Sequence, residues 1–218
     1  MTATIRTRRA AAAAVAAVAL ALAGAAATPA QAAPAQAAAP QTATARTFGP
    51  AGLRGVDYAV WQRDVQAVVD RAKPYIAERT AHPDGTRPAI VLDIDNSSLE
   101  TDFHWAAVPT PAIRPVLELT RYAHERGVAV FFVTARPGIL DAYTEWNLRT
   151  VGYPVDGLYV RHLPDLFHDV STYKAAKRAA IEAQGYTVVA NIGNHDTDLS
   201  GGHAERTFKL PDYDGKLS

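Results

Sequence analysis

The chain has 218 residues with 22 basic and 22 acidic side chains, so its formal net charge is zero. A neutral chain lacks the basic surface that favours nucleic acid or an anionic membrane as a partner. The absence of cysteine excludes disulfides and thiolate metal sites.

Residues 1–32 have the pattern of a secretory signal. Basic residues precede an Ala-rich apolar stretch from Ala10, and Ala30-Gln31-Ala32 offers a small-x-small cleavage site. The alternative is an uncleaved anchor, but the stretch is weakly hydrophobic and short for a bilayer span. We expect cleavage, a secreted protein and no stable membrane insertion afterwards. Cleavage removes three arginines and no acids, which leaves 19 basic and 22 acidic side chains.

Residues 33–50 are expected to form a disordered spacer. They are rich in Ala, Pro, Gln and Thr and contain almost no large apolar side chain. The remaining residues, 51–218, are numerous enough to bury one core, so we expect a single folded domain there.

From Asp57 onward, the hydrophobic pattern alternates between helical and strand spacing. Asp57 is a candidate N-cap of the first helix, and a strand of about five residues follows Pro88. Further helices are expected at about 112–126, 137–149 and 172–185, and further strands at 128–133, 156–160, 187–192 and 206–210. Because each crossover returns the chain to the same edge, this order predicts a Rossmann-like α/β fold. We expect a mostly parallel sheet of about five strands with helices on both faces.

Polar side chains follow several of these strands. Asp93 and Asp95 end the first strand, Thr134 ends the second, and GNHDTD at 193–198 follows the fourth. Lys174 begins the helix that leads to the fourth strand. In an open parallel sheet, ligands bind beyond the carboxyl ends of the strands. Carboxylates hold hard divalent cations, while a hydroxyl and an ammonium bind phosphate oxygens, so this edge is predicted to bind a phosphoryl group with a metal ion.

These motifs resemble those of the haloacid dehalogenase-like (HAD) superfamily. DIDNS at 93–97, the Thr134 that closes FFVT, Lys174 in TYKAAKR and the loop GNHDTD match its four motifs in order and spacing. The stretch YKAAKRAAIEAQGYTVVANIGNHDTDLSGG, followed by RTFKLP, is similar to secreted acid phosphatases related to class B enzymes and plant vegetative storage proteins. The resemblance covers most of residues 50–218 and implies hydrolysis of small phosphomonoesters.

The resemblance also implies a role for each matched residue. Asp93 would attack the phosphorus to form an aspartyl-phosphate, and Asp95 would serve as general acid and then general base. Residues two apart in an extended segment point the same way, which suits this pair. Mg²⁺ would be held by Asp93, the backbone carbonyl of Asp95 and Asp198. Thr134 and Lys174 would bind the oxygens of the transferring phosphate.

One position departs from the family's pattern. The fourth motif commonly has an acid directly after its glycine, but this chain has Asn194 there. An amide oxygen can bind Mg²⁺, although the loss of a charge weakens the site. We expect Asn194 and Asp198 to hold the ion together; the open alternatives are that Asp196 replaces the acid or that metal binding is weak. His195 is expected to be a loop residue, because hard oxygen sites seldom recruit imidazole.

Residues 96–111 are too few for a folded cap domain and are expected to form a minimal flap over an open site. Phe103, His104 and Trp105 lie in this segment and can stack on or orient a leaving group. The other role for these three residues is to pack the flap onto the body, and for Trp105 packing is the expectation.

Two other functions remain open. A binding or storage protein that keeps the fold but turns over little substrate is suggested by Asn194. A phosphorelay receiver also groups acids, a hydroxyl and a lysine at the ends of parallel strands. The export signal opposes the receiver hypothesis, and so does the position of the first acids, because a receiver's phosphoacceptor belongs on the third strand.

Overall fold

The computed structural model describes residues 52–81 and 85–217. The expected signal peptide (1–32) and spacer (33–50) lie outside the described residues. Within the described ranges, none of the helices combines the length and the apolar character needed to cross a bilayer.

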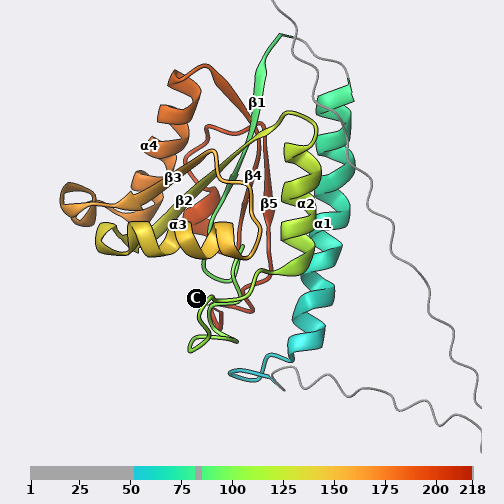
Figure 1. Cartoon of the computed structure of the whole chain (residues 1–218), viewed down its shortest axis with the longest axis vertical. Coiled ribbons are helices and arrows are strands. Elements are labelled where there is room, and N and C mark those ends of the chain that lie inside the picture. Colours follow the sequence, from blue (N-terminus) through green and yellow to red (C-terminus); the bar gives the residue numbers. More distant parts are fainter. Residues whose placement is uncertain (1–51, 82–84, 218) are drawn as a thin grey trace, which may run out of the picture. The chain divides into compact units, whose positions relative to one another are not determined.

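A five-stranded sheet with the order β3-β2-β1-β4-β5 forms the centre of the fold (Figure 1). Every neighbouring pair of strands is parallel. The strands are β1 (Arg87–Leu92), β2 (Ala129–Pro137), β3 (Gly157–Arg161), β4 (Tyr186–Gly193) and β5 (Arg206–Lys209). The predicted sheet is confirmed, and each strand lies within a few residues of its expected position.

The four expected helices are present as α1 (Tyr58–Ala81), α2 (Arg114–His124), α3 (Asp141–Thr150) and α4 (Val170–Ala183); α1 precedes β1, and the other three connect strands. The connections also contain the shorter segments η1 (Gly138–Leu140), η2 (Leu163–Phe167) and α5 (Asp196–Leu199), of which η2 and α5 were not predicted from the sequence. The expected cap of α1 is present, because the Asp57 carboxylate accepts a hydrogen bond of 2.8 Å from the backbone N–H of Val60. The helix expected after Pro137 starts as the single 3₁₀ turn η1 and continues as α3.

Apolar layers cover both faces of the sheet. Ile90 and Leu92 of β1 point into the core formed with α1 and α2, whereas Val91 points into a smaller core on the other face. That smaller core contains Tyr173 and Ile181 of α4. Strands buried on both faces read as continuous apolar runs, which explains why IVL and VFFV lack polar alternation.

The register of the central strands brings their ends together. Leu92 of β1 pairs with Phe132 of β2 on one side and with Ile192 of β4 on the other. β1 and β4 therefore end at nearly the same level, while β2 continues to Pro137, so Asp93, Thr134 and the residues after Gly193 meet at one edge of the sheet.

The segment between β1 and α2 forms the small flap. Phe103 stacks on Trp61 of α1 with 4.7 Å between ring centroids. The buried Glu100 accepts a hydrogen bond of 2.8 Å from the Tyr58 hydroxyl, so polar contacts also fix the flap to α1. The expectation that Trp105 packs the flap onto the body is wrong, because Trp105 is 83% exposed and Phe103 does the packing. Phe103 packs inward instead of Trp105 because the Trp61 ring of α1 lies within reach of position 103.

Candidate active site

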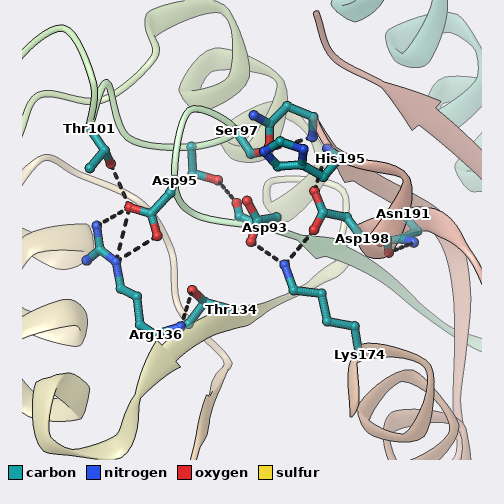
Figure 2. Close-up of polar contacts among 12 residues, drawn as sticks. Asp93, Asp95, Ser97, Thr101, Thr134, Arg136, Lys174, Asn191, His195 and Asp198 are labelled. Carbon is teal, nitrogen blue, oxygen red and sulfur yellow. Dashed lines mark hydrogen bonds and ion pairs between the residues drawn. The ribbon is translucent and has the colours of Figure 1, made fainter. Parts of the chain in front are cut away.

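The carboxyl edge of the sheet gathers the predicted polar side chains (Figure 2). Asp93 comes directly after β1, Thr134 lies in β2, and Asp198 belongs to the short helix after β4. Lys174 reaches the same point from the second turn of α4. Residues more than 100 positions apart in the chain therefore face one another, as the strand order requires.

Lys174 joins two buried carboxylates. Its ammonium donates hydrogen bonds of 2.5 Å to Asp93 Oδ1 and 2.6 Å to Asp198 Oδ1. All three side chains are at least nine-tenths buried. Two carboxylates share one ammonium, so the cluster keeps one negative charge without a partner, which is costly in a buried site.

The protonation of this cluster reflects that cost. Burial raises the pKa of Asp93 to about 6, although the nearby Lys174 ammonium opposes the shift. Burial alone would lower the pKa of Lys174, but Asp93 and Asp198 outweigh burial and raise it above its ordinary value. Lys174 therefore stays charged at neutral pH, whereas the buried surroundings of Asp93 disfavour its ionised form.

Backbone contacts hold Asp198 in place. Its Oδ2 accepts a hydrogen bond of 2.8 Å from the backbone N–H of His195, which caps the short helix α5. Its backbone carbonyl accepts hydrogen bonds from Arg178 (2.7 Å) and from Asn191 (2.9 Å). Gly193 is required beside it, because a Cβ at that position would lie only 2.5 Å from Asp198 Oδ2. His195 contributes its backbone here, consistent with its expected place as a loop residue.

Asp95 lies beside this cluster but has different partners. Arg136 donates to both carboxylate oxygens, from Nη2 to Oδ1 at 2.7 Å and from Nε to Oδ2 at 3.0 Å. The Thr101 hydroxyl of the flap adds a hydrogen bond of 2.8 Å to Oδ1. Such a two-point contact between guanidinium and carboxylate fixes the orientation of Asp95.

Arg136 is a site residue that the sequence reasoning missed. It comes two positions after Thr134 on the extended end of β2, and its side chain is only 13% exposed. The same two-residue spacing that links Asp93 to Asp95 would have suggested it. Its Nη1 also lies 3.3 Å from Thr144 Oγ1 of α3, so α3 supports the Arg136 side chain from outside.

Thr134 and Asn194 are completely buried. The Thr134 hydroxyl oxygen accepts a hydrogen bond of 3.1 Å from the Arg136 backbone N–H, which leaves its own proton to donate. The Asn194 amide oxygen accepts a hydrogen bond of 2.9 Å from the Ser97 hydroxyl, and that hydroxyl accepts 3.0 Å from the Asn194 N–H. The pair of bonds ties the end of β4 to the turn after β1.

Asp196, the alternative metal ligand, lies on the surface. Its side chain is 91% exposed and its carboxylate is 3.2 Å from the Lys209 ammonium. Asp196 therefore lies in solvent, whereas Asp93 and Asp198 are buried together.

The donor set suits a hard divalent cation. In the part of the chain that the structure describes, no three His, Asp or Glu side chains are grouped as a metal site by themselves. The carboxylates of Asp93 and Asp198 provide oxygens around the Lys174 ammonium, whereas the Asn194 amide oxygen accepts a hydrogen bond from the Ser97 hydroxyl. The unpartnered negative charge of the buried cluster is the feature that a cation would offset, and oxygen donors match that chemistry.

The sequence matches a known family over nearly its whole length. The match runs from residue 14 to residue 216 and belongs to the HAD superfamily, subfamily IIIB (acid phosphatase). The chain is a member of this acid phosphatase family, which confirms the resemblance noted in the motifs.

Individual relatives agree with this assignment. The chain is 27% identical over 172 residues to acid phosphatase 1 of Solanum lycopersicum, covering 69% of this chain and 67% of that protein. It is 35% identical over 108 residues to the stem 28 kDa glycoprotein of Glycine max, covering 46% of this chain and 41% of that one. The chain thus aligns with less than half the length of the stem glycoprotein.

A solved structure has the same fold. It is the class C acid phosphatase from Bacillus anthracis with tungstate bound, which superposes with a TM-score of 0.58 at 16% sequence identity. The superposition covers 72% of this chain and 79% of that chain. This similarity supports the HAD-like α/β fold.

Proposed function

We propose that this protein is a secreted, Mg²⁺-dependent acid phosphatase that hydrolyses small phosphomonoesters through an aspartyl-phosphate at Asp93. The observation that carries the proposal is the buried Asp93–Lys174–Asp198 cluster beside the pair of Asp95 and Arg136. Family membership supports the reaction class. The signal pattern of residues 1–32 supports secretion.

In the first half of the reaction, a carboxylate oxygen of Asp93 forms a bond to phosphorus while the ester P–O bond breaks. Asp95 gives a proton to the departing alcohol oxygen. Lys174 and the Thr134 hydroxyl donate hydrogen bonds to the phosphate oxygens, where positive charge and fixed donors stabilise the transition state. Arg136 orients Asp95 through its two-point contact.

In the second half, a water molecule attacks the phosphorus of the aspartyl-phosphate. Asp95, which lost its proton in the first half, takes one from this water, and the bond to Asp93 breaks to give inorganic phosphate. The side chain of Asp95 is 30% exposed, whereas that of Asp93 is 7% exposed, so water reaches the base more easily than the nucleophile. The phosphorus thus undergoes two successive displacements, in which Asp93 first replaces the alcohol and water then replaces Asp93.

Mg²⁺ would be held by Asp93, the backbone carbonyl of Asp95, Asn194 and Asp198, and when bound it supplies positive charge to the phosphate oxygens. All of these donors are oxygens, as Mg²⁺ prefers. The fixed contacts of Asp198 with His195, Arg178 and Asn191 would keep one of them in place.

A protein with the same fold and little turnover is the second candidate. The observation that favours it is the Asn194 amide oxygen, which carries no formal charge and already accepts a hydrogen bond from Ser97. Weak metal binding would then limit catalysis.

Hydrolysis of an aryl phosphate with added Mg²⁺ separates the two candidates. The proposal predicts turnover that a chelator removes and that Asp93→Asn abolishes. Titration calorimetry with Mg²⁺ gives an independent result. If Asp93 is a metal ligand, the Asp93→Asn variant should bind Mg²⁺ more weakly than the native protein does. Absence of turnover with any divalent cation would favour the second candidate.

A further inference from the structure

The last strand of the sheet is followed by a segment that packs beside the site. Residues 210–217 continue from β5, and Figure 1 shows the described chain ending at the same edge of the sheet as the flap. We call residues 209–217, which include the last residue of β5, the C-terminal strap. Its side chains Leu210 and Leu217 are buried, so the strap is packed against the body of the protein.

The C-terminal strap contacts the start of the fourth motif at three points. The Lys209 ammonium donates a hydrogen bond of 2.6 Å to the backbone carbonyl of Asn194. The backbone N–H of Leu210 donates a hydrogen bond of 2.8 Å to the carbonyl of Gly193. The side-chain amide of Asn194 donates to the backbone carbonyl of Leu217 at 3.5 Å. The C-terminal strap therefore contacts both the backbone and the side chain of Asn194.

Two carboxylates hold the Lys209 ammonium in this position. Asp212 Oδ2 lies 3.1 Å from Nζ, and Asp196 Oδ1 lies 3.2 Å from it. Hydrogen bonds from a charged donor are shorter and stronger than those between neutral groups. Lys209 thus joins the C-terminal strap, through Asp212, to the loop that contains Asn194 and Asp196.

The backbone of the C-terminal strap is bent into an unusual conformation. Residues 213–215 all have positive φ, at 53°, 56° and 76°, and two of the three are not glycine. Such a conformation persists where surrounding contacts hold it. One of these contacts is the hydrogen bond of 2.6 Å that the Tyr213 hydroxyl donates to Asp64 of α1. Beyond this bend, the carbonyl of Leu217 meets the Asn194 amide.

We propose that the C-terminal strap orients Asn194 towards the metal ion, with Lys209 as its positioning residue. The inference rests on the proposed function, because it concerns the binding of Mg²⁺. An amide oxygen carries no formal charge, so its value as a ligand depends on how well it is oriented. Residues that orient a ligand without touching the ion commonly change metal affinity by about 10- to 100-fold.

The C-terminal strap also accounts for an amide at position 194. The Ser97 hydroxyl donates to Asn194 Oδ1 at 2.9 Å, and the Leu217 carbonyl accepts from Nδ2, so the two ends of the amide are not interchangeable. An aspartate has no N–H to donate. It would place a carboxylate oxygen against the Leu217 carbonyl, and the two oxygens would repel each other.

The charge and the hydrogen bond of Lys209 act on Mg²⁺ binding in opposite directions. A cation near the site repels Mg²⁺, so removal of the charge alone strengthens binding. Removal of the hydrogen bond to the Asn194 carbonyl releases the loop and weakens binding. The sign of the change in affinity therefore separates positioning by Lys209 from simple electrostatics.

Titration calorimetry of the full chain with Mg²⁺ tests the proposal. We expect Lys209→Met to raise the Kd for Mg²⁺ by about tenfold or more. Lys216→Met is the matched control, because it removes the same charge from an exposed side chain of the same segment. The control should bind Mg²⁺ at least as tightly as the native protein. An unchanged or lowered Kd in Lys209→Met would overturn the proposal.

The dependence of hydrolysis on Mg²⁺ concentration separates positioning from a general loss of structure. In Lys209→Met, the Mg²⁺ concentration that gives half the maximal rate should rise by more than the maximal rate falls. A lower maximal rate with the native midpoint would contradict the proposal. A native protein that takes up no Mg²⁺ would overturn the proposed function together with this inference, whereas native affinity in Lys209→Met would overturn the inference alone.

Hydrogen exchange in the metal-free protein gives a readout that does not involve the ion. Lys209→Met should speed exchange of the backbone amides at 195–198, and Asn194→Asp should speed exchange at 213–217, because each variant removes a contact between the loop and the C-terminal strap. Lys216→Met should leave both segments as protected as in the native protein. Native protection of 195–198 in Lys209→Met would contradict the role of Lys209.

Discussion

Asp93 and Asp95 are separated by one residue in the chain, yet their carboxylates have different surroundings. Asp93 is buried and shares the Lys174 ammonium with Asp198. Asp95 is partly exposed and is held by the Arg136 guanidinium and the Thr101 hydroxyl. One carboxylate therefore sits in an excess of negative charge, and the other has a cation of its own.

The difference suggests a division of labour. A buried carboxylate with unpartnered charge suits a nucleophile and metal ligand, because an arriving cation and phosphoryl group offset its cost. A carboxylate that is oriented and open to water suits proton transfer. The two-residue spacing places both acids at one edge, and the partners that each meets there separate their roles.

The largest expected effect is the loss of the nucleophile. Asp93→Asn should lower kcat by on the order of 10⁴-fold or more, because the amide cannot form the covalent intermediate. Steady-state hydrolysis of an aryl phosphate measures it, and circular dichroism controls for folding. Residual activity within about tenfold of the native protein would show that Asp93 is not the nucleophile.

The next effect is the loss of the acid and base. Asp95→Asn should slow turnover by about 10²- to 10⁴-fold. An aryl ester with a good leaving group needs little protonation, so we expect a burst of phenol followed by slow hydrolysis of the intermediate. Rapid-mixing kinetics measures the burst. If the burst rate and the steady-state rate for such an ester were slowed equally, Asp95 would not be the base that activates water in the second half of the reaction.

The contact between Arg136 and Asp95 should have a smaller effect. Arg136→Lys keeps the charge but loses the two-point geometry, and we expect kcat to fall by roughly 10- to 100-fold with a smaller change in KM. Arg149→Lys, in an exposed ion pair on α3, is the control and should be nearly neutral. An unchanged kcat in Arg136→Lys would show that catalysis does not need the two-point contact between Arg136 and Asp95.

The smallest effect concerns stability and has the opposite sign. In the metal-free protein at neutral pH, Asp93→Asn should raise the free energy of unfolding by about 1–3 kcal/mol, because it removes a buried charge. Burial raises the pKa of Asp93 to about 6, so the free energy of unfolding of the native protein falls as the pH rises through that value. Below that pH, Asp93 in the native protein takes up a proton, so the stability gain of Asp93→Asn should shrink.

Urea unfolding with a chelator at several pH values measures this difference. Asp70→Asn, on the exposed face of α1, provides the control and should show no comparable gain. A destabilised Asp93→Asn at neutral pH would mean that the contact with Lys174 outweighs the cost of the buried charge.

Much of the fold was predictable from local pattern. The apolar runs of β1, β2 and β4 are long and uninterrupted, and parallel strands share one edge, so Asp93, Thr134, Lys174 and Asp198 could be placed together before any coordinates. What the pattern does not contain is how each side chain is held. Arg136 is one of 22 basic residues, and only the extended end of β2 turns it towards Asp95.

The flap was the other limit of the sequence reasoning. It contains no regular helix or strand, so spacing cannot tell which aromatic side chain points inward. Phe103 is buried because Trp61 of α1 offers a ring to stack on, and Trp105 is left outside. His104 lies with its Nδ1 2.8 Å from Glu100 Oε2, beside the same helix. These contacts depend on tertiary packing between segments far apart in sequence.

The most direct test is to trap the intermediate. Asp95→Asn mixed with an aryl phosphate and Mg²⁺ and quenched in acid should carry phosphate on one peptide, and mass spectrometry should place it on Asp93. Hydroxylamine should release it, as expected for an acyl phosphate. Phosphate found on a histidine instead, or turnover in the native protein with no labelled Asp93 in any variant, would contradict the account.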